Sequence, residues 1–505
     1  MAGRFLVAQF LLVYLGAEKN CVGLFLFSDG NDYPELTYVP LGSNKNLFTD
    51  GFLPGTAEGN YYITEMDVST WGRKKGLILS SYQVIKDNRN FRDFSASVFE
   101  LNGKNIAITP SQKIPLSMDV NGPTLNYNRS GLFKVADGKF FYILSIPSWT
   151  EDSSVSLFSA IVSVSSSNIV TFESITAIDE ASTIAEVYSQ NPPPAPPLVP
   201  TPAYENYIYA WWDMQTIQPN KNTAVITFVR LVYGYFANTV QSYTQLAEIH
   251  FYPQLAEIHF YAISVNLSGS SISPSSPTLI RPIIQINLRV SGYLNRNHQV
   301  TAISDTAVVT CYIAIERMSG TWFDRQHRFF SLLTISGGSV SVSTEIEIDP
   351  FYTYTYPSYD EYKTWLLGSE NYLIFVYTGC LETDIEDFDP YTNYTARMLI
   401  SLIKKTGSSF ELLETIDTPY NRLYNKFTDT NNCHFIKLSQ DTFCGMNYKR
   451  LSNNPSTGKP IEPYYYILRV EDDRLVCSET FPIKDFDLLE QSIPYQERVR
   501  EINKI

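Results

Sequence analysis

One pattern of apolar and polar positions recurs seven times along the chain. Each time, a run of alternating or continuous apolar residues is followed by a short turn rich in Gly, Asn, Ser or Asp, and then by a second apolar run. Such a pattern is typical of a β-hairpin, because these turn residues adopt backbone dihedrals that other residues avoid. The hairpins are expected at residues 21–41, 95–116, 156–178, 258–280, 329–348, 396–416 and 464–483.

A second hairpin precedes six of these seven. It consists of a short strand, a polar turn and a longer apolar strand, although the short strand is less clear in two cases. The six stretches are 71–85, 133–147, 219–234, 300–315, 365–379 and 434–448. Two hairpins give four antiparallel strands per repeat, and the repeats follow one another at a period of about 70 residues, with one longer interval before the fourth. Repeated four-stranded sheets are typical of propeller blades.

The chain therefore resembles a seven-bladed β-propeller across nearly its whole length. The resemblance is one of architecture, because the signatures of individual propeller families are missing. It implies an all-β fold of seven four-stranded antiparallel blades in a single domain, 1–505. Each blade would be apolar on both faces, since it lies between two neighbours.

The resemblance also implies that the C-terminal segment closes the ring. The first repeat lacks an innermost strand, because the apolar run that begins at Phe5 already corresponds to the second strand of the blade. Residues 486–505 are the remaining chain and are expected to supply a closing strand or a tail; a charged terminal helix is the alternative. The first twenty residues imitate a secretory signal, with Arg4, an apolar run and small residues. We interpret the run as a buried strand.

Two features fall in the longer interval before the fourth blade. Residues 191–204 are rich in proline and predict a polyproline II connection between the third and fourth blades, with binding to a groove on a partner as the alternative. The phrase QLAEIHFY then occurs twice, at 245–252 and 254–261, around Pro253. A shift of nine residues is odd, so the two copies would point identical side chains to opposite faces of one strand. We assign the second copy to the blade and expect 241–257 to form a projecting loop.

Charge restricts the range of partners. The formal net charge is −14 and no basic tract occurs, so a nucleic-acid backbone would be repelled. The longest apolar run is too short to span a bilayer, so no membrane insertion is expected. The predicted partners are other protein subunits of an assembly, with a glycan as a further candidate.

Cysteine and histidine spacing gives no metal motif. The six cysteines lie far apart without a CxxC pair, and a structural zinc site is not expected. Buried free thiols are the expected state, with a disulfide between Cys433 and Cys444 as the alternative for that pair. The five histidines fit no HExxH or Ser/His/Asp arrangement, so each is expected to be a packed or surface residue.

Two stretches carry the candidate binding chemistry. Residues 349–365 link the fifth and sixth blades and are rich in tyrosine, whose ring offers large contact area and a hydroxyl. The candidate binding residues are Tyr352, Tyr354, Tyr356, Tyr359, Tyr362 and Trp365. Residues 380–395 are acidic, and calcium near Asp384, Glu386, Asp387 and Asp389 is the alternative to a solvated loop. No cofactor is otherwise expected.

These features favour a non-enzymatic structural or attachment propeller. A virion component, such as a phage tail or capsid-associated protein that contacts other subunits or a host glycan, is the first hypothesis, and virion or extracellular is the expected location. The first alternative is a carbohydrate-active propeller of the glycoside hydrolase or sialidase kind. The sequence does not identify a pair of catalytic carboxylates, and the sialidase motif SxDxGxTW is absent. The second alternative is a secreted or cell-surface binding propeller.

Overall fold

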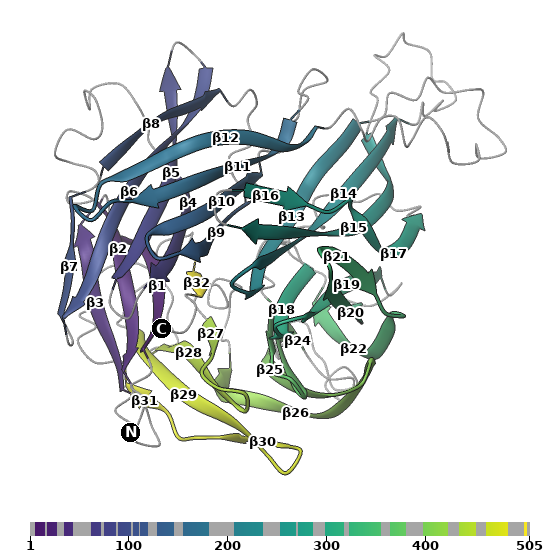
Figure 1. Ribbon diagram of the computed structural model, residues 1–505. Coiled ribbons are helices and arrows are strands. Elements are labelled where there is room, and N and C mark those ends of the chain that lie inside the picture. The colour runs from purple at the N-terminus through teal and green to yellow at the C-terminus, as the bar shows by residue number, and fades with distance from the viewer. Residues whose placement is uncertain are drawn as a thin grey trace, which may run out of the picture.

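A computed structural model of the protein describes residues 6–15, 18–27, 35–43, 62–71, 75–86, 89–102, 105–110, 112–119, 129–145, 155–180, 207–235, 253–268, 271–285, 298–317, 323–354, 364–379, 397–422, 434–450, 461–482 and 499–501. Every regular element in these ranges is a β-strand, and every strand pairing is antiparallel (Figure 1). No helix in the described ranges is long and apolar enough to cross a membrane.

The described strands form seven sheets, numbered in chain order. The first contains β1 (Leu6–Leu15), β2 (Glu18–Phe27), β3 (Glu35–Ser43) and β32 (Val499–Glu501). The second contains β4 (Tyr62–Trp71), β5 (Lys75–Lys86), β6 (Arg89–Asn102), β7 (Asn105–Ile108) and β8 (Gln112–Asp119). The third contains β9 (Arg129–Ala136), β10 (Lys139–Ser145), β11 (Val155–Val164) and β12 (Val170–Glu180).

The remaining four sheets repeat the same order of strands. The fourth contains β13 (Tyr207–Asn220), β14 (Thr223–Tyr235), β15 (Pro253–Ser268), β16 (Ser271–Pro274) and β17 (Thr278–Gln285). The fifth contains β18 (His298–Ser304), β19 (Ala307–Arg317), β20 (Phe323–Ser336), β21 (Ser339–Val342) and β22 (Ile346–Tyr354). The sixth contains β23 (Trp365–Gly368), β24 (Tyr372–Gly379), β25 (Arg397–Thr406) and β26 (Ser409–Arg422). The seventh contains β27 (His434–Lys437), β28 (Thr442–Arg450), β29 (Ile461–Glu471), β30 (Arg474–Cys477) and β31 (Phe481–Pro482).

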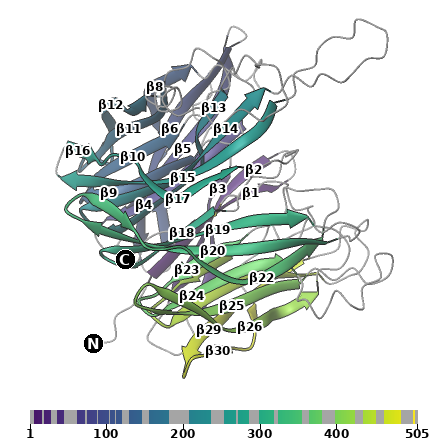
Figure 2. The same cartoon turned by 90° about the vertical axis from the view of Figure 1, so that its right-hand side faces the viewer.

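The sheets follow one another in chain order around their first strands. The first strands of the second to seventh sheets contact each other in succession, from β4 to β9, β13, β18, β23 and β27. In Figure 2 the fifth, sixth and seventh sheets lie one below another in the same order. Repeated antiparallel sheets that meet through their first strands are the hallmark of a propeller. The fold is a β-propeller.

The C-terminal strand lies beside the N-terminal one. β32 pairs with β1 from Gln9↔Glu501 to Leu11↔Val499 (Figure 1). The N-terminal apolar run is thus a strand of the first sheet, and the C-terminal segment contributes a strand at the position expected for the missing innermost strand. The terminal helix is not formed by these three residues. Closure of all seven sheets into one ring stays a prediction.

Turn chemistry explains where the hairpins reverse. All seven predicted hairpins are present, and the residues with positive φ among the described ones lie in tight turns. In the fifth sheet, Gly337 and Gly338 have φ of 58° and 82° between β20 and β21. In the seventh, Asp472 and Asp473 have φ of 50° and 63° between β29 and β30. Glycine adopts this left-handed region freely, and aspartate more readily than bulky residues.

The core consists of apolar layers between neighbouring sheets. Along β10, Phe140, Tyr142 and Leu144 pack toward the second sheet, whereas Phe141 and Ile143 pack toward the fourth. Strand β24 alternates in the same way between the fifth and seventh sheets. Because successive side chains of a strand point to opposite faces, a strand with two buried faces requires an unbroken apolar run. The expected packing of each blade between two neighbours is confirmed for these layers.

A hydroxyl side chain interrupts the outer strand of four sheets at the same place. In each, the backbone N–H of a Ser or Thr donates to a carbonyl of the third strand, and its side-chain oxygen accepts the N–H of that same third-strand residue. The pairs are Thr109 with Val98, Ser275 with Ser264, Ser343 with Leu332, and Ser478 with Ile467. The hydroxyl takes the place of a ladder carbonyl at a bulge. The outer strand is therefore split into two short segments.

The second copy of the repeated phrase belongs to the fourth sheet. It lies in β15 and pairs with β14 along its length, from Tyr235↔Pro253 onward. Residues 253–257, which were expected to end the projecting loop, are thus the first residues of a strand. Proline is tolerated at this first position because it is not required to donate a hydrogen bond there. The first copy, and the rest of 241–252, lie outside the described residues, as does the proline-rich stretch 191–204.

The alternative disulfide is not formed. Cys444 is a free, buried thiol, as is Cys311. In the register of β27 and β28, Ile436 lies opposite Cys444, and Cys433 lies outside the described residues. Burial raises the pKa of the Cys444 thiol, which makes it unreactive.

Candidate functional site

The strands divide the propeller into two faces of different character. In the second to seventh sheets, the first and second strands, and the third and fourth, are joined by short turns at one end, which we call the turn face. The turns of neighbouring sheets touch: the contacts are Asn220 Nδ2 to the Asp305 carbonyl (2.7 Å), Gly368 against Ile303, and the Glu370 N–H to Gln440 Oε1 (3.1 Å).

The opposite end, the loop face, is where the other connections start. Antiparallel strands alternate in direction, so the second strand ends, and the third begins, away from the turns. The chain also leaves each sheet from this end to reach the next one. The tyrosine-rich stretch after β22 and the acidic stretch after β24 therefore both begin at the loop face.

The predicted binding residues differ in where the structure places them. Tyr352 lies in β22 and is 6% exposed, so its ring packs inside the protein. Trp365 begins β23 and is partly buried against Phe435 of the seventh sheet, with ring centroids 5.3 Å apart. Tyr354 is the last residue of β22. Tyr356, Tyr359 and Tyr362 lie outside the described residues.

A bulge before Tyr352 shapes the start of the tyrosine-rich stretch. In the pairing of β20 with β22, Arg328 lies opposite Ile348 and Gln326 lies opposite Phe351. Two residues of β22, Asp349 and Pro350, thus face one residue of β20. Proline has no N–H to donate, so the regular ladder is broken there. The Asp349 carbonyl needs a donor from elsewhere.

The guanidinium of Arg328 supplies that donor. Its Nε donates to the Asp349 carbonyl at 2.9 Å, and its Nη2 donates to the same oxygen. At the other end of the fork, Nη1 donates to Ser401 Oγ of the sixth sheet at 3.0 Å. Ser401 Oγ lies 2.9 Å from Thr415 Oγ1. One side chain therefore connects the bulge to the neighbouring blade.

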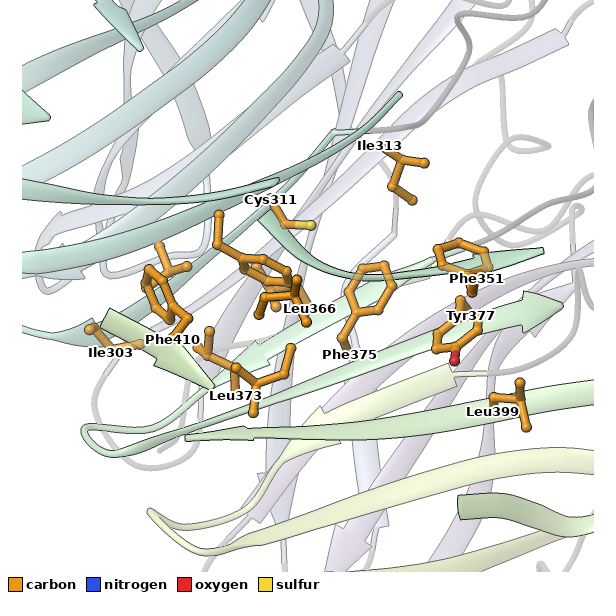
Figure 3. Packing of buried hydrophobic residues seen from close by; sticks show 14 residues of the cluster. Ile303, Cys311, Ile313, Phe351, Leu366, Leu373, Phe375, Tyr377, Leu399 and Phe410 are labelled. Carbon is orange, nitrogen blue, oxygen red and sulfur yellow. The ribbon is translucent and has the colours of Figure 1, made fainter. Parts of the chain in front are cut away.

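Three aromatic rings enclose this guanidinium. Its carbon lies 5.3–5.7 Å from the ring centroids of Phe351, Phe375 and Tyr377. Phe351 and Tyr377 face each other with centroids 4.1 Å apart, and Phe375 stands beside them (Figure 3). Cations are attracted to the faces of aromatic rings. The cage thus combines hydrogen bonds and ring contacts around one charge.

The charge of Arg328 is buried without a carboxylate partner among the described residues. Its side chain is 2% exposed, and its hydrogen bonds go to a carbonyl and a hydroxyl. Desolvation by burial lowers the pKa of the guanidinium, while Tyr377, Cys311 and Asp349 act in the opposite direction. A buried cation whose hydrogen bonds go to uncharged groups is costly. Such a group calls for an explanation beyond packing.

The alternation of buried and exposed positions along β20 is the feature of the sequence that could have revealed Arg328. Gln326, Arg328 and Phe330 share the buried face of the strand. A charged residue at a core position, together with an Asp-Pro step in the next strand but one, indicates a bulge capped by a side chain. Catalytic and metal-binding motifs do not include this combination, so the sequence prediction missed Arg328.

The last residue before the acidic stretch, Gly379, lies beside Tyr352 of β22. Gly379 ends β24, and a Cβ added there would lie 2.7 Å from the Tyr352 carbonyl oxygen. Only glycine lets the two backbones approach so closely. Asp384, Glu386, Asp387 and Asp389 lie outside the described residues, so calcium binding there stays a prediction. No group of three His, Cys, Asp or Glu side chains able to hold a metal occurs in the described part of the chain.

A second polar cluster joins the sixth and seventh sheets at the turn face. Tyr372 donates its hydroxyl to Asp473 Oδ1 at 2.8 Å, and Lys404 Nζ donates to Asp473 Oδ2 at 2.6 Å. The bond from Lys404 lowers the pKa of Asp473, and the bonds to Asp473 raise the pKa of Lys404 and of Tyr372. The side chains of Lys404 and Asp473 are 35% and 44% exposed, so solvent screens the pair.

This cluster should make a small, pH-dependent contribution to stability. The pKa of Asp473 lies below its ordinary 3.8 in the folded chain, so the contribution is present above pH 3.8 and is lost as pH falls through the lowered value. The melting temperature of the wild type should exceed that of Asp473→Asn at pH 7, and the difference should shrink below pH 3.8. Asparagine also tolerates the positive φ of this turn. A difference that is unchanged at pH 3 would contradict the assignment.

Two of the histidines in described strands, His298 and His327, have structural partners. His298 is buried, and its Nε2 lies 2.8 Å from Thr310 Oγ1. His327 Nδ1 lies 2.7 Å from Glu347 Oε1. These contacts agree with the expected packed or surface roles. His259 lies in β15, within the second copy of the repeated phrase.

Comparisons with known proteins bear on the fold alone. No family model matches the chain, and no curated protein matches it. Among solved structures, the chain is similar to the β-propeller domain of Vanderwaltozyma polyspora Nup133, with 9% identity and a TM-score of 0.32 over 73% of this chain and 90% of that one. It is also similar to the NanB sialidase of Streptococcus pneumoniae, with 10% identity and a TM-score of 0.25 over 95% of this chain and 77% of that one. The Trypanosoma rangeli sialidase has 8% identity and a TM-score of 0.27, over 97% of this chain and 87% of that one.

Proposed function

We propose that the protein is a non-enzymatic β-propeller interaction platform. Residues 355–363, the middle of the tyrosine-rich stretch 349–365, contact a partner from the loop face. The observation that supports this is the anchoring of residues 355–363 at both ends. Before it, Phe351 and Tyr352 are buried at the junction of the fifth and sixth sheets. After it, Thr364 is buried and Trp365 packs on Phe435.

Anchored ends suit a binding element. Three tyrosines lie within nine residues between two fixed points, so a partner need not offset the full ordering entropy of a long free loop. Tyrosine supplies contact area and a hydrogen-bonding hydroxyl with few rotatable bonds. The partner classes that fit are another protein subunit of an assembly and a glycan. A virion component, of the phage tail or capsid-associated kind, is the setting we propose.

The test replaces the three tyrosines together in the full-length chain. We expect Tyr356→Ser/Tyr359→Ser/Tyr362→Ser to lower cross-linking to neighbouring subunits in native particles, or binding to a glycan array, by about tenfold, which corresponds to roughly 1.4 kcal/mol. The melting temperature should stay within about 2 °C of the wild type, as is usual for surface substitutions.

A matched control tests whether the loss of binding is specific to this stretch or follows from the removal of any three exposed apolar side chains. Ile169, Leu279 and Val476 are exposed apolar residues of the third, fourth and seventh sheets. Changing all three to serine should leave binding unchanged. Equal loss of binding in both triple variants would contradict the proposal. Hydrolysis of a glycan at enzymatic rates by the wild type would favour the carbohydrate-active alternative instead.

A further inference from the structure

We propose that Arg328 is a positioning residue, which fixes the bulge at Asp349–Pro350 and so sets how the chain leaves the fifth sheet toward residues 355–363. Its consequence for binding rests on the proposed function; its effect on the chain itself does not. The guanidinium acts through the backbone of Asp349 and the rings around it, and it need not touch a partner.

Arg328 donates hydrogen bonds to the Asp349 carbonyl, which an apolar side chain cannot do. Nε and Nη2 both donate to the Asp349 carbonyl, which lies next to the proline that interrupts the ladder. An apolar residue of the same volume would avoid the desolvation of a cation, but it would leave this carbonyl without a donor. A lysine would offer one ammonium group in place of the planar fork. The fork alone can hold the carbonyl and Ser401 together.

The bulge is linked directly to the exit of the chain. Phe351, one residue after Pro350, contacts both the guanidinium and Tyr377. The carbonyl of the next residue, Tyr352, lies against Gly379 of the sixth sheet. Two successive residues of β22, Phe351 and Tyr352, are therefore held against the neighbouring blade shortly before the strand ends at Tyr354. Without the hydrogen bonds from Arg328 to the Asp349 carbonyl, the chain from Phe351 to Tyr354 would lose the first contact that fixes its position.

Hydrogen exchange on the full-length chain tests the inference. In Arg328→Met, we expect the amides of Phe351–Tyr354 to exchange at least tenfold faster relative to those of β10 in the third sheet, which serve as an internal reference. Arg328→Lys should give an intermediate increase, because one ammonium can replace part of the fork. If the methionine variant does not fold, the lysine variant carries the test.

Ser401→Ala is the matched control. It removes the hydroxyl that accepts from Nη1 but leaves both bonds to Asp349 in place. We expect its Phe351–Tyr354 amides to exchange within twofold of the wild type, even where its melting temperature falls. Exchange within twofold of the wild type in both Arg328 variants would overturn the inference, and so would an equal increase in Ser401→Ala.

Binding measurements separate this inference from the proposed function. If exchange rises in Arg328→Met and subunit cross-linking or glycan binding falls about tenfold, both stand. If exchange rises while binding stays at the wild-type level, the positioning role stands and the tyrosine-rich stretch is not the contact site. Chymotrypsin, which cleaves after aromatic residues, gives a second readout: cleavage between residues 351 and 363 should accelerate in the Arg328 variants alone.

Discussion

Replacing Phe375 with alanine is expected to lower the free energy of unfolding by roughly 3–5 kcal/mol. The ring is fully buried between the fifth and sixth sheets. It lies edge-on to Phe330 with centroids 6.1 Å apart. It also lies beside Tyr377, with centroids 5.5 Å apart (Figure 3). Its removal leaves a cavity whose walls are held by two sheets, so they cannot collapse to fill it. The contact with the Arg328 guanidinium is lost as well.

Urea unfolding followed by tryptophan fluorescence measures this loss, and hydrogen exchange locates it. We expect faster exchange in β20 and β24 than in the third sheet, because each sheet contacts only its neighbours and the damage should stay local. Leu279→Ala, at a side chain that is 40% exposed, should change stability by less than about 0.5 kcal/mol. A Phe375→Ala protein as stable as this control would contradict the packing described above.

Replacing Gly445 with alanine should lower stability by roughly 1–3 kcal/mol, as expected for overpacking. Gly445 of β28 lies directly opposite Tyr466 of β29, and the tyrosine ring covers the glycine. An added Cβ would lie 2.6 Å from Cε2 and 2.7 Å from the hydroxyl oxygen of that ring. Tyr466 is fully buried, so it cannot move aside without disturbing the layer between the sixth and seventh sheets.

A double-mutant cycle identifies the clash as the cause. Combining Gly445→Ala with Tyr466→Leu should be less destabilising than the sum of the two single changes, by about 1 kcal/mol or more. Gly337→Asn is the control, because an added Cβ meets nothing within 4 Å there and its φ of 58° suits asparagine. Additive effects in the cycle would mean that Gly445 is required for another reason.

The hairpins could be predicted because their signal is local. A turn such as Gly337–Gly338 needs positive φ, and the residues able to adopt it are few. The strands could be predicted because each lies between two neighbours and is therefore apolar on both faces, as along β10 and β24. The second copy of the repeated phrase was assigned correctly because it runs without interruption into the fourth hairpin.

The candidate site could be predicted only in part. A tyrosine-rich stretch is visible in composition, but composition does not separate anchors from exposed residues. Tyr352 is buried because β22 extends the fifth sheet beyond its bulge, and Trp365 is partly buried because β23 faces the seventh sheet. The expected free thiol is confirmed for Cys444. The disulfide alternative stayed open in the sequence because the register of β27 and β28 depends on pairing, which spacing alone does not determine.

By itself, the sequence determined the repeat, the strand order within each sheet, and hence the face from which the long connections leave. These follow from residue periodicity and turn dihedrals, which act over a few neighbours in the chain. Only the tertiary structure decided that Arg328 holds the Asp349 carbonyl, that Gly379 lies against Tyr352, and that Tyr372 and Lys404 meet Asp473. Each of these contacts joins residues that come together through packing between strands or sheets. No local pattern in the sequence predicts which of these residues will meet.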